Sequence, residues 1–308
     1  MKIEIRSRFE GALLGLALGD ACGAPYEGGV LERLAWRLIT IRAGGELRWT
    51  DDTQLSLCTA ESILAMGRID PDDLAKRFSR AYRWSRGYGP GMAKVLKRIA
   101  RGEHWERASV SVYSGGSFGN GGAMRSPVVG LYCWQRPETL RDSIVASVRT
   151  THAHPLAIEG ALIVATATMM AVSGATTDAI RDEVAKCCVS GPFSTRMQIV
   201  RRWLSEGHDT HPREVVRRLG NGISAMESCM TAVYLALRFM DSPFQDMLGF
   251  AKNCGGDVDT ISAMSGAIWG AGNGVDGLPS ADLDRLEERD VIVGLSRDLC
   301  TLSMMAQA

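Results

Sequence analysis

Two short acidic segments lie far apart in the chain and combine carboxylates with hydroxyls. They are "WTDDT", which contains Thr50, Asp51 and Asp52, and "GGDVDT", which contains Asp257, Asp259 and Thr260. Oxygen donors of this kind are the ligands that Mg²⁺, Mn²⁺ and Ca²⁺ prefer. Each segment alone is also typical of a helix start, where Asp meets the positive end of the helix dipole and Thr accepts from a free N–H.

The two segments together favour a metal site over two separate helix caps. Four carboxylates packed at helix starts would repel one another unless they were protonated or bridged by cations. If the two segments meet in the fold, a dinuclear site with ions about 3.5–4 Å apart follows. Whether they meet depends on the fold, and the sequence does not show it.

A glycine-rich segment, "SGGSFGNGGAMRSP", is the candidate for binding phosphates. Its glycines leave backbone N–H groups free to approach an anion, and Arg125 lies at the start of the helix expected after it. The segment matches neither a P-loop nor a dinucleotide-binding fingerprint, so a flexible turn is an equal alternative. The residues of interest are Gly116, Ser117, Phe118, Gly119 and Asn120.

Three further segments carry weaker signals. "TTHAHP" contains His152 and His154 just before a proline, where a histidine that caps a helix or contacts a ligand is favoured over a transition-metal ligand. "APYEG" contains Glu27, for which a solvated loop acid is an even alternative. "SRGYGPGMAKVL" contains Gly89 in a second glycine-bearing turn into a helix.

Helical periodicity and helix punctuation dominate the chain, so these segments must be positioned by helices. The best strand candidate, residues 37–49, is short, and no linker or solenoid repeat divides the chain. We therefore predict one all-α domain, residues 1–308, with irregular segments at 26–49, 102–122 and 207–212. Helices are predicted at 7–24, 50–67, 70–85, 90–101, 137–150, 155–173, 177–190, 195–206, 213–219, 225–240, 243–252, 257–271 and 280–304.

Composition limits the classes of partner and compartment. The 35 basic and 35 acidic residues cancel, so no overall field favours nucleic acid or an anionic membrane, and no binding to either is expected. The eight cysteines form no CxxC pair and read as reduced core thiols, which favours a cytoplasmic protein.

The N-terminus resembles a signal peptide superficially, but Glu4, Glu10 and Asp20 interrupt the required pattern. The uncharged stretch 160–177 is predicted to be a buried core helix.

Six segments taken in order resemble the ADP-ribosylglycohydrolase family across nearly the whole chain. They are "GALLGLALGDACGAPYEG", "WTDDT", "GSFGNGGAMR", "TTHAHP", "LGNGISAMESCMTAVYLALR" and "GGDVDTISAMSGAIWGA". The resemblance implies an orthogonal multi-helix bundle with two Mg²⁺ or Mn²⁺ ions. The chain is most similar to the type-3 branch, which acts on O-linked, notably serine-linked, ADP-ribose, on poly(ADP-ribose) and on O-acetyl-ADP-ribose. A monomer acting on ADP-ribosylated proteins or ADP-ribose-containing small molecules is expected.

The resemblance also assigns roles to individual residues. One ion is held by Thr50, Asp51, Asp52 and Asp259, and the other by Asp257, Asp259 and Thr260, with Asp259 bridging. Glu27 corresponds to a loop glutamate that contacts the second ion and is required for turnover. Gly89 belongs to the "RGYGPG" turn of the type-3 match. Residues 116–120 correspond to the loop over the phosphates and distal ribose, and His152 to a pyrophosphate contact. Phe118 departs from the expected tyrosine, so a phenolic hydrogen bond is lost there.

Two alternative functions remain open at this point. The arginine-directed branch of the family tends to carry an aspartate near the "RGYGPG" turn, and no aspartate lies between Trp84 and Ala93, which counts against it. The family also contains crystallin-like relatives, so a non-catalytic protein that binds ADP-ribose is the second alternative. The presence of Glu27 and of every expected metal ligand favours an enzyme.

Overall fold

The computed structural model describes residues 3–27, 45–207 and 209–305, and most of these residues are helical. Within them no β-strand occurs, and the β-type contacts are two isolated bridges, Leu47 with Leu286 and Gly119 with Ser224. The predicted all-α class is therefore confirmed. Residues 37–44 of the strand candidate lie outside the described residues, and residues 45–49 contribute one bridge.

The α-helices are α1 (Ile5–Gly23), α3 (Asp51–Met66), α4 (Pro71–Ala81), α5 (Pro90–Ala100), α6 (Trp105–Ser111), α7 (Ser126–Tyr132), α8 (Leu140–Val148), α9 (Pro155–Val172), α10 (Thr177–Cys187), α11 (Gly191–Ser205), α12 (Pro212–Arg218), α13 (Ala225–Arg238), α14 (Phe244–Cys254), α15 (Val258–Asn273), α16 (Ser280–Leu283) and α17 (Arg289–Met305). Five 3₁₀ turns accompany them, at Ala24–Tyr26, Trp84–Arg86, Asn120–Gly122, Pro137–Thr139 and Val275–Gly277.

Local signals set several helix ends where the sequence predicts them. The Thr50 side chain caps α3 by accepting from the N–H of Asp52, and α3 ends at Gly67, whose φ of 66° is left-handed. Asp70 caps α4 by accepting from the N–H groups of Asp72 and Asp73, and Pro71 occupies the first helical position. These ends depend on residues only a few positions apart, which is why the sequence shows them.

Two predicted segments are wrong. The irregular segment 102–122 contains a helix, α6, whose Trp105 indole N–H donates to Asp72 of α4. The single helix predicted over 280–304 is instead α16 and α17, separated by a turn in which Glu288 has φ 55°. That turn is held by a contact remote in sequence, because the Leu47 N–H donates to the Arg285 carbonyl and the Glu287 N–H donates to the Leu47 carbonyl.

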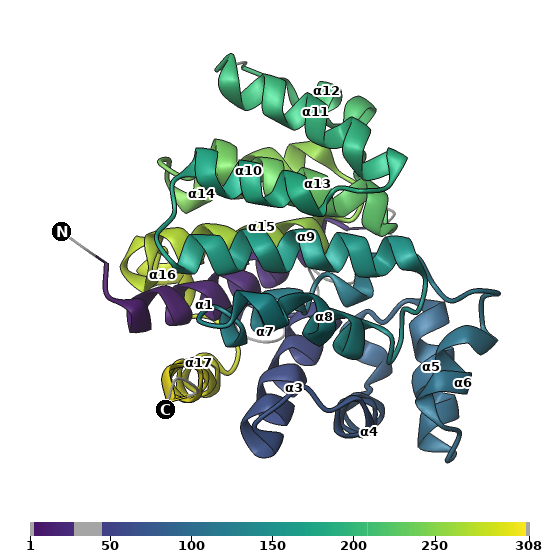
Figure 1. Ribbon diagram of the computed structural model, residues 1–308. Coiled ribbons are helices and arrows are strands. Elements are labelled where there is room, and N and C mark those ends of the chain that lie inside the picture. The colour runs from purple at the N-terminus through teal and green to yellow at the C-terminus, as the bar shows by residue number, and fades with distance from the viewer. Residues whose placement is uncertain (1–2, 28–44, 208, 306–308) are drawn as a thin grey trace.

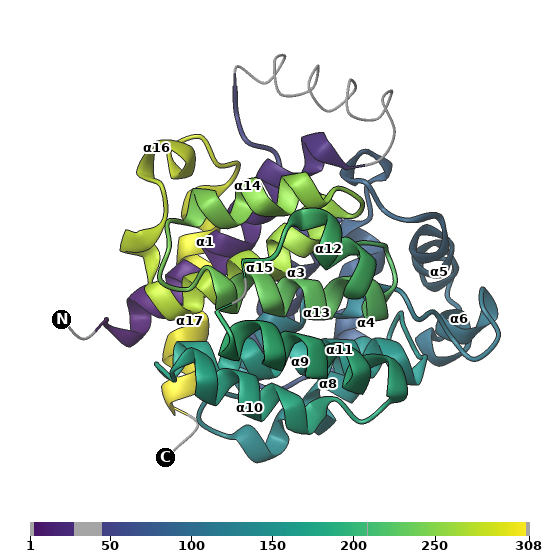
Figure 2. The same ribbon diagram turned by 90° about the horizontal axis from the view of Figure 1, so that it is seen from above.

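The helices are stacked in layers and cross at steep angles. Figure 1 shows α1, α9 and α15 running across the middle of the molecule, with α17 and α4 seen almost end-on below them. In the view from above, α13 and α14 cover α15 (Figure 2). Helix α9 has the length and composition of a membrane span, yet 72% of it is buried inside the protein against α7, α8, α10, α13 and α15. The apolar stretch predicted as a core helix is the central helix of the structure. All eight cysteines are free, and six are buried.

The closest helix contact joins α1 to α15 through glycines spaced four residues apart. A Cβ added to Gly11 would lie 2.4 Å from the Gly270 carbonyl oxygen, and one on Gly15 would lie 2.3 Å from that of Gly266. The same contact continues toward the start of α15, where a Cβ on Gly23 would lie 2.5 Å from the Asp259 Cα. Real Cβ atoms do not approach backbone this closely, so only glycine allows these two helices to touch.

This contact makes a prediction about stability. Gly15→Ala should lower the free energy of unfolding by about 1–3 kcal/mol, because the new methyl group must push α1 and α15 apart. Urea unfolding followed by circular dichroism measures the change. Gly249→Ala is the matched control, since Gly249 lies inside α14 with no atom near its added Cβ, and alanine there should stabilise by up to about 1 kcal/mol. Equal stability of the two variants would contradict the close contact.

Candidate functional site

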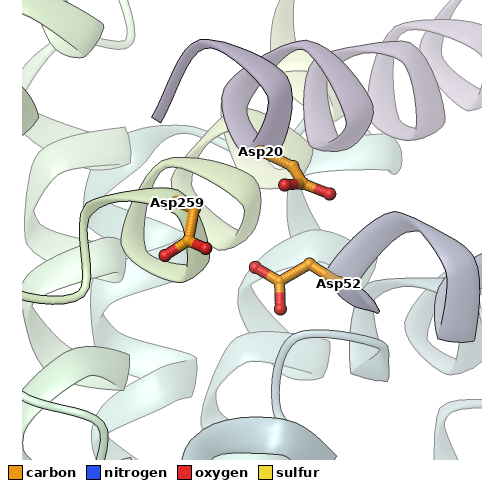
Figure 3. Close-up of side chains that lie close together, drawn as sticks. All are labelled: Asp20, Asp52 and Asp259. Atoms are coloured by element: carbon orange, nitrogen blue, oxygen red, sulfur yellow. The ribbon is translucent and has the colours of Figure 1, made fainter. Parts of the chain in front are cut away.

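Carboxylates from three helices converge at one end of the α1–α15 contact. Asp20 of α1, Asp52 of α3 and Asp259 of α15 point toward a common point (Figure 3), with one oxygen from each lying within 4.8 Å of the others. A second group with the same spacing consists of Glu27, Asp257 and Asp259. The two acidic segments of the sequence therefore meet, and Asp259 belongs to both groups.

Asp20 is a member of this cluster that the sequence interpretation missed. It is fully buried, and its two oxygens accept from the Thr50 N–H at 3.0–3.1 Å, from the Thr53 N–H at 3.0 Å and from the Thr53 hydroxyl at 2.5 Å. Asp20 thus caps the start of α3 from another helix. The available signal was an acid in the middle of the apolar run "LLGLALGDACGA", because a carboxylate is rarely buried without partners.

Asp52 carries an unsatisfied oxygen that fits a cation. Its Oδ1 accepts from the Thr260 hydroxyl at 3.4 Å, whereas its buried Oδ2 has no hydrogen-bond partner. Burial, and then the neighbouring carboxylates, raise the pKa values of Asp51, Asp52 and Asp259 well above the usual range. A buried carboxylate oxygen without a donor is costly, and a divalent cation would remove both that cost and the repulsion. The donor set of carboxylate and hydroxyl oxygens suits Mg²⁺ or Mn²⁺.

The remaining predicted ligands lie around the same cluster. Asp51, Asp257 and Thr260 line one cavity together with Asp52, Asp259 and Glu27. Thr50 is buried behind them, where its hydroxyl caps α3 and its N–H donates to Asp20.

The glycine-rich loop forms another wall of that cavity and is fastened to the acidic cluster. The Asn120 amide donates to Asp257 and, at 3.0 Å, to the Ser228 hydroxyl of α13. The Asn120 N–H donates to the Ile223 carbonyl at 3.0 Å, while the Asp257 N–H donates to the Asn221 carbonyl at 2.9 Å. The turn "GNGIS" therefore holds both the loop and Asp257 in place. This explains why "LGNGISAMES" accompanies the site without supplying an acid to it.

His152 faces the loop as a neutral donor. It is buried beside Arg125, and burial first, then that cation, lowers its pKa to about 3. The Thr151 hydroxyl oxygen accepts from Arg125 at 2.9 Å and also forms a hydrogen bond of 2.8 Å with the His152 Nδ1. The other ring nitrogen of His152, Nε2, faces the loop. A Cβ added to Gly121 would lie 2.9 Å from this Nε2, so the loop backbone passes directly against it.

Arg125 does not reach the cavity as a phosphate ligand. It is fully buried, its guanidinium lies 4.7 Å from the centre of the Phe78 ring, and it donates to the carbonyls of Gly121 and Ser147. Burial lowers its pKa to about 9. Its structural effect is to anchor the glycine loop from behind, which the position of Arg125 in the sequence did not reveal.

The cavity has an empty volume of about 750 Å³, part of it open to solvent. Besides the acids, it is lined by Ser117, Gly119, Asn120, His152 and Gly89, all of them predicted substrate contacts. Two other predicted contacts do not line it. Gly116 is buried against Ala153 with φ 88°, and Phe118 is 51% exposed with its ring edge-on to His154 at 5.7 Å. His154 itself caps α9 by accepting from the Leu156 N–H.

Arg86, which precedes the cavity-lining Gly87, fixes the start of α3. The Arg86 guanidinium lies 3.6 Å from the centre of the Trp49 ring, donates to the Trp49 carbonyl at 2.8 Å and forms a bidentate pair with Glu287. The Trp49 indole donates to the Glu287 carbonyl at 3.1 Å. Arg86 also precedes the turn through Gly87 and Gly89, which lines the cavity. The ion pair between Arg86 and Glu287 therefore holds this turn close to Trp49, the residue before Thr50.

Comparison with known proteins identifies the family. A model of the ADP-ribosylglycohydrolase family matches residues 1–308. The chain belongs to the ADP-ribosylglycohydrolase family. The ADP-ribosylhydrolase ARH3 of Danio rerio is 31% identical to this chain. The match covers 99% of this chain and 93% of the Danio rerio protein. The ADP-ribosyl-[dinitrogen reductase] glycohydrolase of Rhodospirillum rubrum is 30% identical, over 94% of each chain. A solved ADP-ribosylglycohydrolase-related protein complex contains a chain that is 28% identical and superimposes with a TM-score of 0.70, over 98% of this chain and 99% of that one.

For this ADP-ribosylglycohydrolase, the shared position of Asp259 makes a prediction about cations. In the wild type, Mg²⁺ should raise the melting temperature above that of protein treated with EDTA. The reason is that Mg²⁺ binds the acidic cluster of the folded protein and not the unfolded chain. Asp259→Asn should abolish that increment, yet leave the EDTA-treated protein at least as stable as the wild type, since one of the repelling charges is gone. The increment should shrink as pH falls, because protons compete for carboxyls with raised pKa values.

Differential scanning fluorimetry with and without Mg²⁺ measures both quantities. Asp241→Asn, at an exposed aspartate after α13, is the matched control and should keep the full increment. A wild type that shows no increment at any pH would contradict the metal site.

Proposed function

We propose that this ADP-ribosylglycohydrolase removes ADP-ribose from O-linked, serine-type modified proteins with the help of two divalent cations, Mg²⁺ or Mn²⁺. The proposal extends to poly(ADP-ribose) and O-acetyl-ADP-ribose. One observation carries the proposal. Asp259 belongs to two clusters of three acidic side chains, and these clusters border a cavity whose other walls are a glycine loop and a neutral histidine. The similarity to ADP-ribosylhydrolase ARH3 supports the same reading.

Thr50, Asp51, Asp52, Asp257, Asp259, Thr260 and Glu27 are the residues that would hold the cations. When bound, such ions supply Lewis-acid polarisation of sugar oxygens and balance the charge of the buried acids. Cleavage at the anomeric carbon of ribose proceeds through an oxocarbenium-like transition state, which gains from a negatively charged surrounding. An acidic cavity suits that charge.

The remaining residues bind and orient the substrate. Backbone N–H groups of the glycine loop and the His152 Nε2–H are neutral donors, which suit a pyrophosphate beside an acidic cluster. The Asn120 amide, by donating to Asp257, keeps the loop and the acids at a constant separation. Glu27 lies at the edge of the cavity with its carboxylate near Asp257 and Asp259, where it can move a proton or orient water.

The role of Glu27 leads to a prediction about turnover. Glu27→Gln should retain ADP-ribose binding and lose at least about a hundredfold in turnover, because the amide has similar shape but cannot accept a proton. Binding by calorimetry and release of ADP-ribose from a modified peptide are measured in parallel. Glu46→Gln, at an exposed glutamate that does not line the cavity, should behave as the wild type. Near-normal turnover of the Glu27 variant would contradict this role.

Linkage specificity is tested by a direct comparison of substrates. The similarity to the Rhodospirillum rubrum dinitrogen-reductase glycohydrolase favours an arginine-directed enzyme as the second candidate. Against it, the turn from Trp84 to Ala93 that borders the cavity contains no aspartate to pair with a guanidinium leaving group. We expect Mg²⁺-dependent release from a serine-linked peptide and little from an arginine-linked peptide of the same sequence. Preference for the arginine linkage would reverse the assignment, and binding without release would indicate a non-catalytic ADP-ribose reader.

A further inference from the structure

One flank of the molecule carries a concentration of positive charge that the balanced total conceals. Residues 76–101 contain nine lysines and arginines and no aspartate or glutamate, although the whole chain has 35 of each sign. Three of the nine are paired with acids outside that range, because Arg77 contacts Asp73, Arg86 contacts Glu287 and Arg98 contacts Glu103. The other six have no carboxylate within 4.0 Å among the described residues. They are Lys76, Arg80, Arg83, Lys94, Lys97 and Arg101.

These six residues form what we call the basic face, on α4, α5 and the residues just after each helix. Lys76 and Arg80 lie four residues apart on the side of α4 away from the buried Leu74 and Phe78, and Arg83 lies in extended backbone just after the helix. Lys94, Lys97 and Arg101 follow the helical spacing on α5, away from the buried Met92, Val95 and Leu96. All six side chains are exposed. The basic face therefore gathers exposed cations that no described carboxylate neutralises, and of these Arg83 donates to the carbonyls of Arg80 and Tyr82.

The two helices that carry these cations are neighbours, and an exposed aromatic ring lies in the turn that joins them. Leu74 and Phe78 of α4 pack in one cluster with Met92 and Leu96 of α5. The Lys97 ammonium lies 5.4 Å from the centre of the Tyr82 ring, so a cation of α5 reaches the end of α4. Trp84, in the turn that joins the two helices, is 85% exposed. A large aromatic side chain held this far into solvent is a platform for stacking.

We propose that the basic face and Trp84 bind single-stranded nucleic acid. Exposed cations can follow a phosphate backbone, and an exposed indole can stack on an unpaired base. An acidic peptide would use the cations but would leave the indole unused, and a duplex offers no exposed base face to it. The earlier expectation of no nucleic-acid binding relied on net charge, which averages this face against acids located elsewhere.

The basic face adjoins the cavity without sharing residues with it. Pro90, Gly91 and Met92, in the first turn of α5, line the cavity, and Lys94 lies one turn beyond them. A strand on this face would therefore hold the cavity next to proteins assembled on that strand. The proposal does not depend on the hydrolase activity, because none of the six cations nor Trp84 lines the cavity.

The test measures the salt dependence of binding to a fluorescein-labelled oligothymidylate of about 12 nucleotides, a length within the usual site size. Fluorescence anisotropy over a series of NaCl concentrations should give a slope of log K against log salt of about −2 or steeper for the wild type. The triple variant Lys94→Gln, Lys97→Gln, Arg101→Gln should lose about two units of that slope, at about 0.7 for each phosphate contact. Trp84→Ala should weaken binding about tenfold and keep the slope, because it removes stacking and no charge.

The matched control removes the same charge elsewhere. Arg213→Gln, Arg217→Gln, Arg218→Gln acts on three exposed arginines in α12, which lies apart from α5 in both Figure 1 and Figure 2, and should leave the slope unchanged. All variants should keep the melting temperature of the wild type in differential scanning fluorimetry, which shows that they are folded. The proposal is overturned if the wild type does not bind, or if the control triple variant loses the same slope. It is also overturned if polyglutamate of equal charge displaces the oligonucleotide equally well, or if a duplex of the same length binds as tightly.

Discussion

The close contact between α1 and α15 sets the distances on which the site depends. Every fourth residue of α1 from Gly11 to Gly23 faces backbone of α15 at a separation that excludes a Cβ. Helix α1 therefore holds Asp259 directly, at the Gly23 end of the contact. Through the buried Asp20, the same helix also caps α3 and so holds Asp52. Each of the two acidic segments is held in place by α1. The distance between the two segments therefore depends on this helix.

The buried acids divide into two groups according to what their oxygens contact. Asp20 accepts several N–H and O–H donors, and Asp257 accepts from Asn120, so these two act also as fasteners for α3 and for the glycine loop. Asp52 retains an oxygen with no donor, and burial first, then neighbouring negative charge, raises the pKa values of Asp52 and Asp259. Burying a carboxylate oxygen without a donor is costly, and the Asp52 oxygen is therefore open to a ligand of positive charge. The fasteners make that arrangement rigid.

Two arginines that do not line the cavity hold its walls in place. Arg125 anchors the glycine loop and helps to keep His152 neutral, while Arg86 joins the turn before α5 to the residue before Thr50. Both arginines are withdrawn from the cavity, which keeps the donors that face a pyrophosphate neutral. A group of exposed cations without carboxylate partners among the described residues lies instead on the outer flank formed by α4 and α5. The molecule thus separates a cavity with acidic and neutral walls from a basic surface.

Features that depend on neighbours a few residues apart were determined by the sequence itself. These include the capped start of α3 at Thr50, its end at Gly67, the proline at the first position of α4 and the long apolar run of α9. The family and the acidic pair also follow from short motifs, whose residue types are those that metal binding requires. The tertiary structure alone decided what depends on remote partners: the cap that Asp20 supplies to α3, the burial of Arg125 behind the loop, and the break before α17, where Leu47 pairs with the residues around Leu286. It also decided that Phe118 and Gly116 lie outside the cavity, and that evenly balanced charges are unevenly distributed in space. The reason is physical, because helix ends are set by local hydrogen bonds, whereas the meeting of two distant segments is set by how closely a third helix allows them to approach.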